Sequence, residues 1–220
     1  MTGVQTCALP IFSRADRIVG PGSLYVTAAK KIVAAETGID FIAGPSEVVL
    51  IAASGKAAWL AADMMAQAEH DPAAVAILLT PSRKLAAAVA AHVGPKWPNC
   101  AAVLTRSIDE AMEVSNRIAP EHLWLADPRL LSLVTSAGSV FLGSHSPVAA
   151  GDYASGPNHT LPTAGAARLR GGLSVSDFLK IVTVQQLTPR GLAGLAPAIV
   201  SLARAEGLEN HARSIEVRLR

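Results

Sequence analysis

The stretch VVLIA at residues 48–52 decides the fold class. Five consecutive apolar residues, three of them β-branched, predict a strand that is buried on both faces of a parallel sheet. Working outward, further strands are predicted at 75–79, 102–104, 123–126 and 139–142, and helices between them at 57–69, 85–93, 108–118 and 129–136. Strands that alternate with helices of about ten residues predict an α/β fold, here a Rossmann-like parallel sheet flanked by helices.

The regions on either side of this alternation have a different pattern. A helix is predicted at 25–36 after the turn Gly20-Pro21-Gly22, a long loop at 143–163, and helices at 176–180 and 192–207. We therefore predict an unrelated segment at 1–12, a Rossmann-like domain at 13–165 and a helical C-terminal tail at 166–220 that serves dimerisation. Ligands of parallel sheets bind at the carboxyl ends of the strands, so the site is expected there.

Composition excludes several classes of protein. Of 220 residues, 50% are hydrophobic and 16% charged, which excludes a disordered chain. The net charge of +2, without a basic stripe, predicts no nucleic-acid partner. The longest uncharged stretch, 130–151, contains Ser, Thr, Gly, Pro and His, so no membrane span is predicted. Two cysteines form no disulfide framework, which indicates a reducing compartment and hence a cytoplasmic location.

Two pairs of residues have the chemistry of metal ligands. Gln67 and His70 are three apart on a predicted helix end, so they share one face and could share a cation; a solvated helix end is the alternative. Asp152 and His159, in the glycine-rich loop, offer an oxygen and a nitrogen ligand; a plain Asp-capped turn is the alternative.

Glu121 and His122 follow Pro120 at the start of a predicted strand. Neighbouring residues within a strand point to opposite faces, so the pair is expected to act from a strand end, where both can reach one pocket. A carboxylate and an imidazole there could both serve as bases near neutral pH. A surface glutamate beside a capping histidine is the alternative.

Three further residues are weaker candidates. Ser46 could donate a hydrogen bond to a substrate or simply close a turn, and Glu206 and His211 have the pattern of an ordinary helix end. The chain has no GxGxxG, Walker or GxSxG motif, so a standard dinucleotide site, a P-loop or a serine hydrolase cannot be argued from motif.

Taken together and in order, eight segments resemble histidinol dehydrogenase over about residues 13–220. They are IVGPG, YVTAAK, GIDFIAGPSEVVLIA, AQAEHD, SNRIAPEHL, AGSVFLG, GDYASGPNHTLPT and EGLENHARS. The resemblance implies a zinc-dependent homodimer that oxidises L-histidinol to L-histidine through the aldehyde. This reaction uses NAD twice and is the last step of histidine biosynthesis.

The resemblance also implies roles for individual residues. Gln67, His70, Asp152 and His211 match the zinc ligands, the last supplied by the other subunit, so that the active sites are shared. His122 matches the base that takes the alcohol proton, and Glu121 the base that activates water for attack on the aldehyde. The positions that match substrate contacts are these four ligands together with Ser46, His122, His159 and Glu206.

Departures from the family pattern concern the cofactor and the N-terminal side. The family's N-terminal half is missing, MTGVQTCALPIF at 1–12 does not match, and the Asn that follows GPG and contacts NAD is Ser23 here. We therefore expect a C-terminal portion that keeps metal binding and has weak NAD binding. The alternatives are a paralogous zinc- and NAD-dependent alcohol or polyol dehydrogenase, and a non-catalytic zinc-binding fragment.

Overall fold

The computed structural model describes residues 15–219, and the chain divides after Phe178 into two compact units. The unrelated segment predicted at 1–12 lies outside the described residues. The predicted domain boundaries at 13–165 and 166–220 stay predictions.

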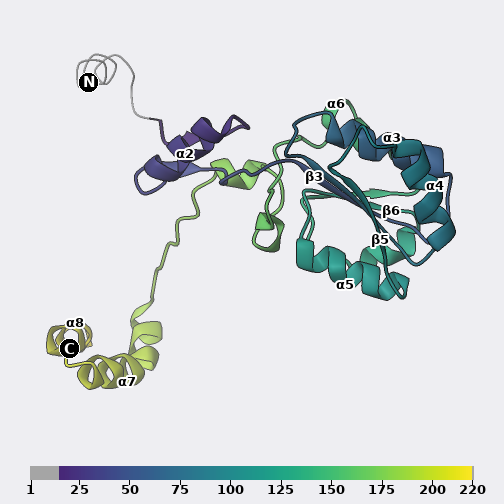
Figure 1. Ribbon diagram of the computed structural model, residues 1–220. Helices are drawn as coiled ribbons and strands as arrows, with labels where there is room; N and C mark the ends of the chain where they lie inside the picture. Colours follow the sequence, from purple (N-terminus) through teal and green to yellow (C-terminus); the bar gives the residue numbers. More distant parts are fainter. Residues whose placement is uncertain (1–14, 220) are drawn as a thin grey trace, which may run out of the picture. The chain divides into compact units, whose positions relative to one another are not determined.

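The first unit is built on one parallel sheet of five strands (Figure 1). The strands lie in the order β5-β4-β3-β6-β7, and all neighbouring pairs are parallel. Their bounds are β3 Glu47–Ile51, β4 Val75–Thr80, β5 Cys100–Leu104, β6 His122–Leu125 and β7 Ser139–Leu142. The predicted fold class is thus confirmed, with strand bounds that differ from the prediction by at most two residues.

Helices cover both faces of this sheet. α3 (Ala57–Ala68), α4 (Arg83–Val93) and α6 (Val148–Tyr153) pack on one face with Val48 and Leu50 of β3. α5 (Ile108–Ile118) packs on the other face with Val49 and Ile51. Because successive strand residues point to opposite faces, every residue of the run is buried, which explains its unbroken apolar pattern.

A small parallel pair precedes the main sheet. β1 (Arg17–Ile18) pairs with β2 (Gly38–Ile39), and α2 (Leu24–Val33) connects them. Lys30 and Asp40 form a buried ion pair with Nζ and Oδ1 2.7 Å apart. Lys30 also donates to the carbonyl oxygen of Gly20, and Asp40 Oδ2 accepts from the Gly20 amide, so the pair holds the turn that starts at Gly20.

Some predicted elements differ from the structure. The segment 143–163, expected to be a loop throughout, contains α6, which begins after Pro147 and carries Asp152. The helix expected at 129–136 is the 3-10 helix Pro128–Leu133, which Asp127 caps and which ends at the extended Val134. Shorter 3-10 turns lie at Ala166–Arg168 and Val175–Phe178.

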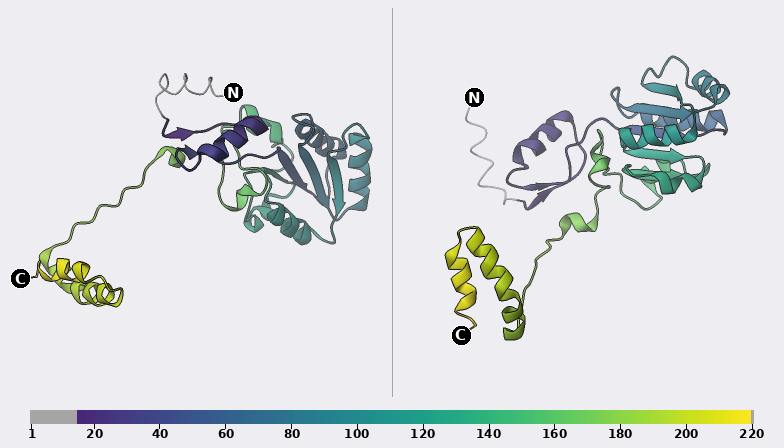
Figure 2. Two further views of the ribbon diagram at one scale, coloured as in Figure 1. Left: turned by 60° about the vertical axis from the view of Figure 1, so that its left-hand side comes forward. Right: turned by 90° about the horizontal axis from the view of Figure 1, so that it is seen from below.

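The second unit is a pair of helices, which Figure 2 shows packed against each other. α7 (Pro189–Ala205) and α8 (Glu209–Glu216) are separated by a turn in which Gly207 has φ 75°. The helix expected at 192–207 thus begins earlier and ends at this turn, and α8 was not expected as a separate helix. Among residues 15–219, no helix is long and apolar enough to cross a membrane.

Candidate active site

The candidate residues of the first unit gather at the amino ends of the strands. His122 is the first residue of β6, with Glu121 just before it, and Ser46 precedes β3. A helix that joins two parallel strands runs back across the sheet, so the last turn of α3 brings Gln67 and His70 to the same edge. The expectation that the site lies at the carboxyl ends was therefore wrong for these residues.

Glu121 and His122 are both buried, with 5% and 4% of their surface exposed. Glu121 Oε2 lies 3.6 Å from His122 Nδ1, so the two side chains meet at the strand end as expected. Burial raises the pKa of Glu121, while the charge of His122 and hydrogen bonds from Ser46 and the Glu47 amide oppose the rise. Because its pKa is raised toward neutral pH, this carboxyl group is better suited to act as a base than a solvated glutamate.

Asp152 lies between His122 and His70. Its Oδ1 lies 3.7 Å from His122 Nε2, and its Oδ2 lies 4.0 Å from His70 Nε2. The contact with the His122 imidazole lowers the pKa of Asp152, against a smaller rise from burial, and the charges of His122, His70 and His159 lower it further. Asp152 is therefore ionised at neutral pH and available as an anionic ligand.

Gln67 completes this group. Its side chain is buried, its Nε2 has no hydrogen-bond partner, and it lines a cavity of about 50 Å³ with His70 and Asp152. Within residues 15–219, no three His, Cys, Asp or Glu side chains are placed to hold a metal ion. A metal site here therefore needs a different donor, and an amide oxygen supplies one.

The donor set fits zinc. Two ligands of one tetrahedral zinc ion lie about 3.4 Å apart, since each is about 2.1 Å from the metal. The 4.0 Å between His70 Nε2 and Asp152 Oδ2 is within a small side-chain rotation of that spacing. Both ring nitrogens of His122 are buried without a hydrogen-bond partner, so this imidazole can still form hydrogen bonds with a bound group.

A pocket of about 250 Å³ brings further candidates to the same edge. Ser46, His70, Glu121 and His159 line it, as do Pro21 and Gly22 of the turn that the Lys30–Asp40 pair holds. Ser23 follows this turn as the residue that precedes α2, and its side chain makes no capping hydrogen bond. The predicted cofactor contact therefore stands next to the pocket that holds the predicted substrate contacts.

Glu47 was missed by the sequence reasoning. Its amide donates to Glu121 Oε2 at 3.1 Å, and its own Oε1 is buried without a partner. Burial raises the pKa of Glu47, and the nearby charge of Glu121 raises it further. The signal was present, because Glu47 immediately precedes the VVLIA run and so had to lie at the same sheet edge as Ser46.

Glu206 and His211 belong to the second unit. Glu206 directly follows α7 as its C-cap, His211 lies near the start of α8, and both are exposed. Their contribution to the site stays a prediction.

The fold and the site define a Rossmann-like α/β domain whose candidate acid–base and metal-binding side chains lie around two pockets at the amino edge of its sheet, with His70 lining both. The family model for histidinol dehydrogenase matches residues 7–219. The chain belongs to the histidinol dehydrogenase family.

Individual relatives agree with this assignment. The chain is 50% identical over 209 residues to a histidinol dehydrogenase of Archaeoglobus fulgidus, covering 92% of this chain and 52% of that protein. It is 47% identical over 222 residues to one from Ruegeria pomeroyi, covering 93% and 51%. The crystal structure of histidinol dehydrogenase from Elizabethkingia anophelis matches with a TM-score of 0.89 at 40% identity, over 94% of this chain and 52% of that one. The chain thus spans about half the length of the curated relatives that it matches.

Proposed function

We propose that this chain carries the zinc-binding and acid–base half of an NAD-dependent enzyme that oxidises L-histidinol to L-histidine through the aldehyde. The observation that carries the proposal is the meeting of Glu121, His122 and Asp152, with separations of 3.6 and 3.7 Å, beside His70 and Gln67. Two successive oxidations need two bases, and the site offers a carboxylate and an imidazole in contact.

The two bases have separate roles in this proposal. His122 takes the proton of the alcohol, because its ring nitrogens have no other partner and Asp152 stabilises the imidazolium that forms. Glu121 takes a proton from the water that attacks the aldehyde carbon. The Ser46 hydroxyl and the Glu47 amide hold its carboxylate in place. Ser46 and His159, in the same pocket, contact the substrate.

Gln67, His70 and Asp152, with His211 of a second subunit, would hold the zinc ion. When bound, zinc anchors and polarises the substrate and NAD accepts the hydride. Glu206 would contact the substrate from the same second subunit, so the proposed assembly is a homodimer with shared sites. The proposed partner is a small molecule rather than nucleic acid or a membrane, and the proposed location is the cytoplasm.

The direct test follows NADH formation by the chain with L-histidinol, zinc and NAD. Zinc content, dimerisation and histidinol binding are measured on the same sample. We expect zinc and histidinol to bind and NAD to bind weakly, since Ser23 is shorter than the family's asparagine. If a folded, zinc-loaded dimer binds histidinol but forms no NADH, the chain alone is not the enzyme. If it binds neither zinc nor histidinol, the proposed site is wrong.

A second candidate is a related alcohol or polyol dehydrogenase. His159 lines the same pocket as Ser46 and Glu121, and an imidazole there suits an imidazole or amine substrate better than a polyol. Calorimetry with histidinol and a panel of polyols separates the two candidates, because tighter binding of a polyol would favour the second. The third candidate, a non-catalytic zinc-binding fragment, is the result expected if zinc binds and substrate does not.

A further inference from the structure

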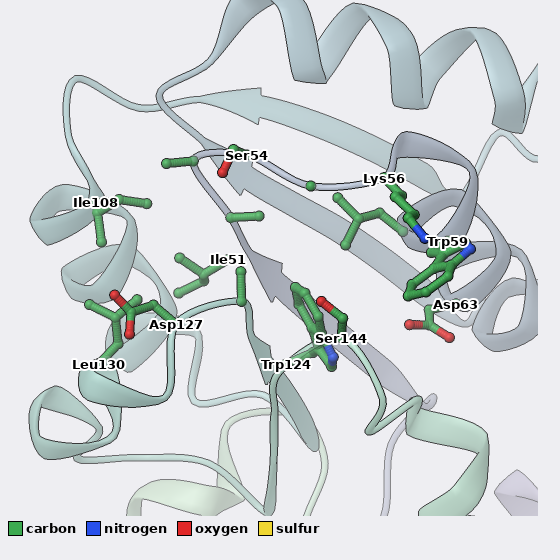
Figure 3. A pocket seen from close by; sticks show the side chains of 15 residues that line it. Ile51, Ser54, Lys56, Trp59, Asp63, Ile108, Trp124, Asp127, Leu130 and Ser144 are labelled. Carbon is green, nitrogen blue, oxygen red and sulfur yellow. The ribbon is translucent and has the colours of Figure 1, made fainter.

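A second pocket of the first unit lies at the opposite edge of the sheet from the candidate active site. It has a volume of about 410 Å³ and is lined by the ends of β3 and β6 and by the start of α3 (Figure 3). From β3 the chain continues to β4 and β5 on one side, while β6 and β7 lie on the other. The pocket thus lies where the strand order reverses, which is where open α/β sheets bind ligands. None of the candidate acid–base or metal-binding side chains lines it, although Asp63 lines both this pocket and the small cavity beside Gln67.

One part of this pocket is positively charged. The Nζ atom of Lys56 lies 3.9 Å from the centre of the Trp59 ring, and within residues 15–219 no carboxylate pairs with it. Lys56 directly precedes α3, whose first turn has no acidic residue and no side-chain cap. The ammonium group and the open helix start face the same pocket, so this part suits an anionic group such as a phosphate.

A second part offers a hydrogen-bond acceptor. Asp63 lies further along α3, and Figure 3 shows its carboxyl group next to the Trp59 ring. This carboxyl is partly buried and, in the described part of the chain, has neither a hydrogen bond nor an ion pair. Its burial raises its pKa to about 6. A carboxyl withdrawn from water without a donor is unfavourable, and a ligand that donates hydroxyl groups would relieve this.

The other acidic side chain of the pocket is already engaged. Asp127 forms an ion pair with Arg129 at 2.6 Å. The rest of the lining combines apolar side chains such as Ile51 with the hydroxyl groups of Ser54 and Ser144, and the Trp124 Nε1 donates to the Gly143 carbonyl oxygen. Within residues 15–219, the pocket therefore offers the Lys56 cation, the Asp63 acceptor, two serine hydroxyls and the Trp59 indole, which is 42% exposed and has the His145 ring 5.9 Å away.

We propose that this carboxyl-edge pocket binds a mononucleotide, with its phosphate on Lys56, its ribose hydroxyls on Asp63 and its base against Trp59. A volume of about 410 Å³ lies in the range of small-molecule pockets, about 300–1,000 Å³. The ammonium that now lies over the Trp59 ring moves to the phosphate, and the base takes its place on the indole. Asp63 also lines the small cavity beside Gln67, His70 and Asp152, whereas Lys56 and Trp59 line the carboxyl-edge pocket and not that cavity. The proposal does not depend on the proposed function.

The test is a titration of the full chain with AMP, followed by calorimetry and tryptophan fluorescence. We expect saturable binding of AMP, with adenosine and inorganic phosphate each binding at least tenfold more weakly. Lys56→Met should weaken AMP binding at least tenfold and adenosine binding by less than twofold. Asp63→Asn should weaken AMP binding at least fivefold, and should have no further effect on the weaker binding of 2′,3′-dideoxyadenosine monophosphate.

The chain contains a matched control for the lysine. Lys96 lies over Trp97 at 5.1 Å, outside the pocket, so Lys96→Met removes the same kind of contact and should leave AMP binding unchanged. Ser46→Ala, in the amino-edge pocket, should also leave it unchanged. The proposal is overturned if AMP does not bind saturably or if phosphate alone binds as tightly. It is also overturned if Ser46→Ala or Lys96→Met weakens AMP binding as much as Lys56→Met does.

Discussion

The two edges of the parallel sheet differ in whether their ionisable side chains affect one another. At the amino edge, Glu47, Glu121, His122 and Asp152 form a chain of neighbours, and the pKa of each carboxyl depends on burial and on the groups next to it. At the carboxyl edge the pocket is larger, yet its unpartnered carboxyl, Asp63, is perturbed by burial alone. The first edge is a coupled network and the second a set of independent groups. Substitutions at the first should therefore affect one another, while those at the second should add.

The largest effect is expected from the buried Lys30–Asp40 pair, which holds the turn that lines the amino-edge pocket. Lys30→Met leaves Asp40 buried without its cation, which should reduce the free energy of unfolding by about 3 kcal/mol. The turn at Gly20 then loses the Lys30 contact that fixes it. Chemical denaturation measures the loss, and hydrogen exchange of the Gly20 amide reports the local opening.

Lys31→Met is the control, since Lys31 is exposed on the same helix. A loss below about 1 kcal/mol for Lys30→Met would mean that the pair does not hold this turn.

The next largest effect is expected at the proposed metal ligands. His70→Ala should weaken zinc binding roughly a hundredfold or more, since even residues that only orient a ligand change affinity 10- to 100-fold. Competition with a chromogenic chelator measures the affinity directly and needs no turnover. His92→Ala, an exposed histidine in the last turn of α4, should leave it unchanged. Equal losses in both variants would remove His70 from the ligand set.

How much the sequence predicts also differs between the two edges. The strands, the parallel sheet and the amino-edge candidates followed from apolar runs and from motifs, because Gln67, His70, Glu121 and His122 are chemically distinctive at their spacing. The sheet edge itself was predicted wrongly, because the rule for parallel sheets concerns their carboxyl ends. His122 is the first residue of β6, so its side chain lies at the amino end of the strand, where this rule does not apply.

The carboxyl-edge pocket had no sequence signal. Ser54, Gly55 and Lys56 match no phosphate-binding motif, and an aspartate within an apolar helix has the pattern of a solvated residue. Only the packing of α3 against the sheet shows that Asp63 is withdrawn from water. The helix α6 was missed for a related reason, since a six-residue helix within a loop rich in glycine has no periodicity to detect.

A smaller effect, with a defined pH dependence, is expected at Asp63. Its pKa rises from 3.8 to about 6 on folding, so the folded state holds the proton more tightly than the unfolded state. Its contribution to stability is therefore complete below pH 3.8 and is lost as the pH rises through about 6. Asp63→Asn removes this loss. The gain should be on the order of 1 kcal/mol at pH 7.5, because solvent partly screens the group, and close to zero at pH 4.

Thermal or urea unfolding at the two pH values measures this gain. Asp109→Asn in the exposed first turn of α5 should have the opposite sign at neutral pH, because a carboxylate there is favourable to the helix. A gain at Asp63 that is the same at both pH values would show that the carboxyl is not perturbed by burial.

The smallest effect on stability is expected at Lys56. Lys56→Met keeps the length of the side chain and removes only the charge over Trp59, and such contacts contribute about 0.5–1 kcal/mol at exposed sites. Lys96→Met removes the longer contact over Trp97 and should cost less than this. Urea denaturation of both variants, measured against the wild type, gives the two values. A loss for Lys56→Met well above 1 kcal/mol would mean that Lys56 is fixed in the folded structure and is not available to a ligand. A small loss means that the Lys56 ammonium can leave the Trp59 ring with little decrease in stability, as binding of a phosphate requires. It would also mean that Lys56 at the carboxyl edge is not held by a strong contact within the protein, unlike the ionisable groups of the amino edge.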